Sequence, residues 1–168
     1  MIPILLFSIF AACGTEAEPD FEPPSTQPEP EPIADTRAQY SVTLTLSDDI
    51  RQIELRFGQH SNPTTQDEQM PPAPPDGTLH AHFTRGDKNY WRDFRSEDSE
   101  AEEWDFSFQT GANGTVVLEW NVQTTRFPGT LSLINPSDDS SVDMDGSGEI
   151  ELPASSTGSL LFEYLLDE

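Results

Sequence analysis

An alternation of apolar and polar residues with a period of two runs through much of the chain from residue 40 onward. Every second residue is apolar in Tyr40–Leu46, and the same alternation returns in Trp104–Phe108 and in Val116–Val122. Successive side chains of a β-strand point to opposite faces of a sheet, so this pattern predicts strands with one buried face. No segment shows a convincing helical period, and we therefore expect an all-β domain.

Polar segments with turn-forming residues separate these predicted strands. Ser47–Asp49 is typical of the turn of a hairpin, and the prolines within residues 71–75 exclude a helix or a central strand there. About eight short strands at such spacing favour a two-sheet antiparallel β-sandwich. Further inward-facing residues are predicted at Ile53, Leu55, Phe57, Leu79, Ala81, Phe83, Leu131, Leu133, Ile150, Leu152, Leu160, Phe162, Tyr164 and Leu166.

The N-terminal part of the chain has a different composition. Residues 1–10 are almost wholly apolar, too few to span a bilayer but typical of a signal peptide. Glutamate and proline dominate the residues that follow, and such a composition cannot form a core. We therefore expect a signal peptide over 1–12, a disordered acidic tether over 13–38 and the β-sandwich domain over 39–168.

The sequence Phe10-Ala11-Ala12-Cys13 resembles the lipobox of bacterial lipoproteins. In that family the cysteine is acylated and the peptide bond before it is cleaved, so the resemblance implies that Cys13 is the lipidated first residue of the mature protein. It also implies export by the general secretory route. Gly14 after the cysteine is the pattern that implies passage to the outer membrane in many diderm bacteria. The alternative is an ordinary buried free cysteine.

The order of motifs between residues 41 and 166 is similar to that of immunoglobulin-like modules in secreted proteins of Bacteroidetes and related bacteria. The resemblance implies a fold and an exported protein but no activity, because the residues that carry it are packing and turn positions. Among the segments that carry it are Leu55-Arg56-Phe57-Gly58, Pro71-Pro72-Ala73-Pro74-Pro75, Leu79-His80-Ala81-His82-Phe83, Asp93-Phe94-Arg95 and Phe127-Pro128-Gly129.

The net charge restricts the partners of this protein. The chain has 31 acidic and 8 basic residues, which gives a formal net charge of −23. A field of this sign repels nucleic acids and anionic lipid surfaces. We expect no nucleic-acid partner, while an envelope protein, a cation or a neutral glycan is compatible with the charge.

One acidic segment near the C-terminal end matches the first positions of an EF-hand calcium loop. Asp143, Asp145, Ser147 and Glu149 alternate as oxygen ligands do in such a loop, but Ala154 stands where the loop needs a bidentate glutamate. These residues form either a weak calcium site or an acidic β-turn between two strands. No other cofactor is expected.

Two further groups of residues could bind a ligand. Tyr90, Trp91 and Arg92 combine aromatic rings with a guanidinium, a composition that could stack against a carbohydrate ring or equally serve internal packing and ion pairs. His80 and His82 are two residues apart, so on a strand they share one face, as a transition-metal pair would need. The alternative for both histidines is simple exposure to solvent.

Catalytic motifs are not recognisable in the sequence. A Gly-x-Ser-x-Gly elbow and a phosphate-binding glycine loop are missing, and the single cysteine is assigned to lipidation. We therefore predict a non-enzymatic lipoprotein, anchored by its lipid on the cell surface or in the periplasm, that serves as a structural or protein-interaction module. The alternative is a carbohydrate- or calcium-binding module.

Overall fold

The computed structural model describes residues 37–110, 115–154 and 156–167. The predictions for Cys13, for the signal peptide and for most of the tether lie outside these residues. No helix in the described ranges is long and apolar enough to cross a membrane.

The described residues form eleven strands and one short 3₁₀ helix, η1 (Pro63–Thr65). The strands are β1 (Gln39–Ser47), β2 (Gln52–His60), β3 (Glu68–Gln69), β4 (His80–Arg85), β5 (Lys88–Ser96), β6 (Ala101–Gln109), β7 (Val116–Arg126), β8 (Gly129–Asn135), β9 (Ser140–Asp143), β10 (Ser147–Leu152) and β11 (Thr157–Leu166).

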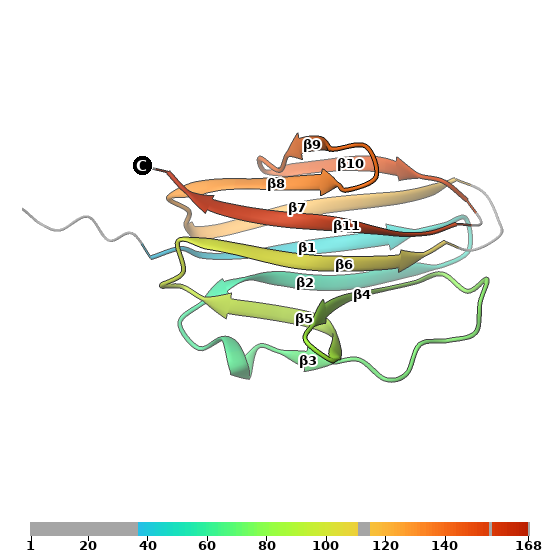
Figure 1. Ribbon diagram of the computed structural model, residues 1–168, viewed down its shortest axis with the longest axis horizontal. Helices are drawn as coiled ribbons and strands as arrows, with labels where there is room; N and C mark the ends of the chain where they lie inside the picture. Colours follow the sequence, from blue (N-terminus) through green and yellow to red (C-terminus); the bar gives the residue numbers. More distant parts are fainter. Residues whose placement is uncertain (1–36, 111–114, 155, 168) are drawn as a thin grey trace, which may run out of the picture. The chain divides into compact units, whose positions relative to one another are not determined.

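All eleven strands belong to one mixed sheet (Figure 1). Its order is β10-β7-β1-β2-β5-β4-β6-β11-β8-β9, and β3 pairs with β5 beside this path. The β2–β5 pair is parallel, and the other pairs are antiparallel. β1 and β2 form the predicted hairpin. In its turn, the Asp48 carboxylate accepts hydrogen bonds from the backbone N–H groups of Ile50 and Arg51.

The sheet curls strongly into a half-barrel. Tyr40 of β1 and Tyr164 of β11 lie on strands far apart in the sheet order, yet their ring centroids are 5.4 Å apart. The rings of Phe57 in β2 and Phe162 in β11 are 4.7 Å apart. The two halves of one sheet therefore face each other across a shared aromatic core.

The predicted two-sheet immunoglobulin-like sandwich of about eight strands is therefore wrong, although the all-β class is correct. β5 joins what would have been two sheets, because its first residues pair with β4 and its last residues pair with β2. The apolar alternation reveals which residues face inward but not which strand edges are hydrogen-bonded. It also misses β3 and β9, whose residues are all exposed.

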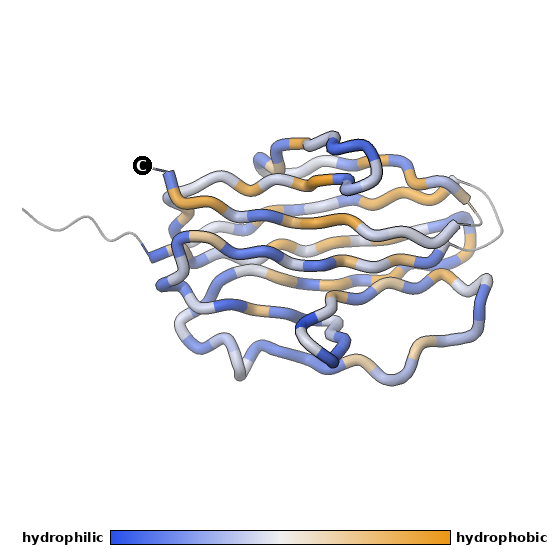
Figure 2. Tube along the Cα trace, viewed as in Figure 1, coloured by the Kyte–Doolittle hydropathy of each residue, from blue (hydrophilic) through white to orange (hydrophobic). Residues whose placement is uncertain are grey.

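The core lies on the concave face of the sheet. Figure 2 shows apolar and polar residues alternating along most strands. The structure confirms the predicted inward residues over most of the sheet, and Ile53, Val122, Ile150 and Leu166 are only partly buried. The largest fully buried side chains include Phe57, Phe83, Trp104, Phe106, Phe162 and Tyr164.

Candidate functional site

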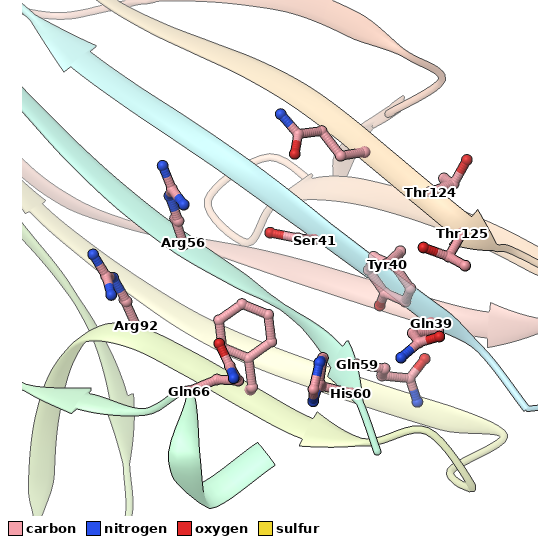
Figure 3. Close-up of a pocket in the computed structure, with 12 residues that line it drawn as sticks. Gln39, Tyr40, Ser41, Arg56, Gln59, His60, Gln66, Arg92, Thr124 and Thr125 are labelled. Carbon is pink, nitrogen blue, oxygen red and sulfur yellow. The ribbon is translucent and has the colours of Figure 1, made fainter. Parts of the chain in front are cut away.

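The outer face of four neighbouring strands carries a polar hollow (Figure 3). The strands β7, β1, β2 and β5 lie side by side, and their register aligns outward side chains in rows across the sheet. One row is Asn121, Thr43, Arg56 and Arg92, and the next is Gln123, Ser41, Gly58 and Phe94. Gly58 has no side chain, so the second row is open between Ser41 and Phe94, and we call the hollow the Gly58 groove.

The backbone at this position requires glycine. Gly58 has a φ of +149°, a conformation that L side chains rarely adopt. A Cβ atom built there would lie 2.2 Å from the backbone oxygen of Tyr40 on the adjacent strand. Backbone atoms of β1 therefore leave no room for a side chain at this position.

The Gly58 groove has a volume of about 280 Å³ and is lined by 12 residues. Among its described lining residues there are two arginines and a histidine but no aspartate or glutamate, although the chain has 31 acidic residues. The other lining side chains are mainly amides and hydroxyls. The lining residues are Gln39, Tyr40, Ser41, Arg56, Gln59, His60, Gln66, Arg92, Phe94, Gln123, Thr124 and Thr125.

Two side chains on this surface have orientations fixed by their neighbours. Nδ1 of His60 accepts the backbone N–H of Asn62 at 3.1 Å, so the proton of the neutral imidazole is on Nε2, which is left as a donor. The His60 ring meets the Phe94 ring edge-on with centroids 6.5 Å apart. Phe94 is 6% exposed, so it forms a firm apolar wall.

In the described part of the chain, the ion pairs of the two groove arginines are exposed. Arg56 donates two hydrogen bonds of 3.0 and 2.8 Å to Glu54, and Arg92 lies 3.4 Å from Glu68. Both members of each pair are about half exposed, and pairs of this kind contribute little to stability. Either guanidinium is therefore able to turn toward a ligand.

A charged network on the concave side of β5 supports the groove from beneath. Tyr90 of β5 pairs with the inward Phe83, and Asp93 pairs with the inward Phe57, so both face inward. Inward residues of a regular strand are an even number of positions apart, but these two are three apart. The strand β5 therefore bulges between them. This bulge places Asp93 inside the protein, where it is 0% exposed.

Two guanidinium groups accompany the buried Asp93. Nη1 of Arg85 lies 2.9 Å from Oδ1 of Asp93 and forms an ion pair with it, but the geometry is not that of a hydrogen bond. Nη2 of Arg95 donates a hydrogen bond of 3.1 Å to Oδ2 of Asp93. Burial raises the pKa of Asp93 to about 6, and the charges of Arg95 and Arg85 oppose this rise. The indole N–H of Trp104 donates to the backbone oxygen of Asp93 at 3.0 Å.

The network also holds the backbone of Phe94. Asp67 pairs with Arg85 and accepts the N–H of Phe94 at 2.9 Å, while Arg85 donates to the carbonyl oxygen of Phe94 at 3.2 Å. Both backbone polar groups of this groove residue are therefore bound by buried or half-buried ionic side chains. The packing of the core thus positions the apolar wall of the groove.

The structure separates the three residues predicted to stack on a sugar ring. Tyr90 is 6% exposed, and the guanidinium carbon of Arg85 lies 4.4 Å from its ring centroid. Trp91 is 37% exposed, and Arg92 lines the Gly58 groove. Only Trp91 and Arg92 are therefore available at the surface.

The residues of the predicted calcium loop lie around the connection between two edge strands. β9 ends at Asp143 and β10 begins at Ser147, whose hydroxyl oxygen accepts a hydrogen bond of 3.0 Å from the amide of Asn121. Glu149 lies opposite Glu119 of β7. In the described part of the chain, no group of three or more His, Cys, Asp or Glu is arranged to hold a metal ion.

The two histidines of β4 share the outer face of the sheet, as predicted. Their ring centroids are 5.5 Å apart, and each ring is partly buried. Burial lowers the pKa of both imidazoles, and the charge of His80 lowers that of His82 further. Within the described ranges the structure brings no third Cys, His, Asp or Glu ligand to the pair.

Most residues of the Gly58 groove were not predicted from the sequence. The one available signal was Gly58 itself, because a glycine within an alternating strand marks a close approach of another backbone. The alignment of Gln123, Ser41, Gly58 and Phe94 depends on pairing between four strands, which the sequence does not reveal.

Comparison with known proteins gives no relative from which a function could be transferred. No protein-family model, no curated protein and no solved structure matches this chain significantly.

Proposed function

We propose that this chain is a lipid-anchored, non-enzymatic protein of the bacterial cell envelope, and that its β-domain is a binding module with the Gly58 groove as its contact surface. The lipobox-like sequence ending in Cys13 supports the anchor, and the Glu/Pro-rich residues after it support a tether between anchor and domain. The proposal includes anchoring in the outer membrane, because Gly14 after the cysteine is the pattern of lipoproteins that pass to that membrane in many diderm bacteria.

The observation that carries the binding function is the composition and rigidity of the Gly58 groove. Its apolar wall at Phe94 is held by Asp67 and Arg85. The polar side chains that line the groove are uncharged or cationic, although the protein as a whole is strongly acidic. A preformed concave surface with a few convergent polar groups is typical of a ligand-binding site.

We expect that replacing Cys13 with alanine removes the membrane anchor completely. Cys13 is the single cysteine, so thioether acylation has no alternative residue. Intact-mass analysis of the wild-type chain from the membrane fraction of bacterial cells should show cleavage before Cys13 and the added mass of acyl chains. The variant should lack that mass and leave the membrane fraction.

A Thr15→Ala variant is the matched control, because it changes one residue near the cysteine without removing the thiol. It should carry the same acyl mass as the wild type. An unmodified wild-type chain in the soluble fraction would refute the anchor, while leaving the binding function of the groove to be tested separately.

A second candidate function, binding of a neutral carbohydrate, is favoured by the lining of the groove. Amides, hydroxyls and guanidinium groups of Gln39, Gln66, Gln123, Ser41 and Arg92 surround a hollow with one aromatic wall. Such groups pair readily with sugar hydroxyls, and the net charge does not repel a neutral polymer.

Filling the groove should abolish this binding. Ser41 lies beside Gly58 on the outer face, so Ser41→Phe places a ring in the hollow without entering the core. Against a panel of neutral oligosaccharides, the wild type should bind at least one, and Ser41→Phe should weaken that binding at least about tenfold, or ~1.4 kcal/mol.

Thr45→Phe is the control for this experiment. Thr45 is an outward residue of the same strand, but it is not part of the groove lining. Its variant should bind as the wild type does. A panel without any binding, or equal losses in the two variants, would exclude the groove as a carbohydrate site.

A further inference from the structure

The two end strands of the sheet enclose an apolar pocket on the molecule's surface. β10 and β9 are the first and last strands of the sheet order, so among the described strands each has a neighbour on one side only. A hollow of about 500 Å³ lies between them, and both strands contribute to its lining. We call it the edge pocket; its apolar lining residues are Phe108, Leu133, Val142, Ile150, Leu152 and Leu160.

The edge pocket combines two features that bind extended peptides. An end strand presents backbone N–H and C=O groups that have no partner in the ladder. Beside these groups, Val142 of β9 is 41% exposed, and Ile150 of β10 is partly buried. A peptide strand added at such an edge gains main-chain hydrogen bonds, and every second side chain enters the apolar hollow.

The charge around the pocket defines the partner. The chain has no lysine, arginine or histidine after Arg126, although it has nine acidic residues there. Glu149 and Glu151 lie on β10, and Asp143 ends β9. A second copy of this chain would bring the same negative charge to the interface, so self-association through these edges is opposed.

We propose that the edge pocket binds an extended segment of a basic partner protein, which adds to the free edge of β10 as a further strand. Apolar side chains of the partner enter the pocket, and the alternate lysine or arginine side chains meet Glu149 and Glu151. None of the described residues lines both the edge pocket and the Gly58 groove, so this interaction goes beyond the proposed function and is measured independently of it.

Two lysine-rich peptides of about eight residues test the proposal with the full chain. In the first, lysine alternates with valine or leucine; the second has the same composition with all lysines in one block. The alternating peptide should bind by calorimetry and slow hydrogen exchange of the β10 amides in residues 147–152. The block peptide should bind at least about tenfold more weakly, because its side chains cannot separate onto two faces of a strand.

Val142→Glu and Ile50→Glu are matched variants for the same measurement. Both replace an exposed apolar residue and add one negative charge, but Ile50, at 72% exposure, lies in the turn between β1 and β2. Val142→Glu should weaken binding of the alternating peptide at least tenfold despite the added attraction for lysine. Ile50→Glu should keep the wild-type affinity within about twofold, and thermal melting should show both variants folded.

Equal binding of the two peptides, or no effect of Val142→Glu, would overturn the proposal, because either result means general electrostatic attraction to an acidic protein. Absence of binding would overturn it as well. Acylation at Cys13 and ligand binding in the Gly58 groove are unaffected by these outcomes, so the proposed function stands or falls separately.

Discussion

Replacing Gly58 with alanine is expected to lower the free energy of unfolding by about 3 to 5 kcal/mol. Two effects add. The φ of +149° is strained for any residue with a Cβ, and the new methyl group would lie 2.2 Å from the Tyr40 oxygen. Since that oxygen is backbone of β1, relief requires β1 and β2 to separate where they pair, at Ser41 and Gly58.

Gly86→Ala is the control for a glycine of positive φ whose surroundings leave room for a methyl group. Gly86 has a φ of +64°, and no atom of the described residues lies within 4 Å of a Cβ built there. This variant should lose about 1 kcal/mol, the usual cost of a left-handed non-glycine residue. Urea unfolding of both variants measures the difference, and equal losses would mean that β1 moves to accommodate the methyl group at no cost.

The same experiment bears on the function. If Gly58→Ala remains folded at low temperature, its methyl group pushes against the backbone of β1 beside Ser41, which lines the groove. Ligand binding should then be lost together with stability, whereas Gly86→Ala should retain binding. A groove that is built around one obligatory glycine thus couples the pairing of β1 and β2 to the shape of the site.

The sequence predicts the core far better than the connections between strands. Alternation identifies residues such as Leu44, Phe57 and Phe106 as inward, and all three are buried. It does not reveal that β2 and β5 pair in parallel, because parallel pairing depends on contacts between segments separated by a long loop. This one pair turns two expected sheets into a single curled one.

The Gly58 groove could not be predicted from the sequence for a related reason. Arg92 was identified as a candidate ligand-binding residue, but Tyr90, two residues earlier, was expected on the same surface. The bulge in β5 sends Tyr90 into the core and Arg92 to the outer face. Nor does the sequence show that Asp67, in a polar loop, reaches Arg85 and the backbone of Phe94.

The buried Asp93 should make stability depend on pH in an unusual direction. Its pKa rises from 3.8 to about 6 in the folded protein, mainly because burial disfavours the charged carboxylate. The folded state therefore binds this proton more tightly than the unfolded chain. The resulting stabilisation is complete below about pH 4 and is lost as the pH rises through about 6.

An Asp93→Asn variant separates this contribution from those of the many other carboxylates. Asparagine resembles the protonated aspartic acid in shape and cannot ionise, while Arg85 keeps Asp67 as a partner and Arg95 keeps Glu102, 4.0 Å away. The rise in pKa from 3.8 to about 6 corresponds to about 3 kcal/mol. The free energy of unfolding of the variant, minus that of the wild type, should therefore rise by up to that amount between about pH 4 and pH 7.

Urea unfolding at several pH values measures this difference, with Asp105→Asn, an exposed carboxylate on β6, as the comparison for the loss of one charge. If the difference instead falls as the pH rises, the guanidinium groups of Arg85 and Arg95 outweigh burial. Asp93 would then stabilise the protein as an ion, and the bulge in β5 would be held by charge pairing. If the difference in free energy of unfolding rises with pH, the ionised Asp93 and its two arginines lower the stability of the protein. Such a cost is expected where buried ionic groups fix the geometry of a site rather than stabilise the fold.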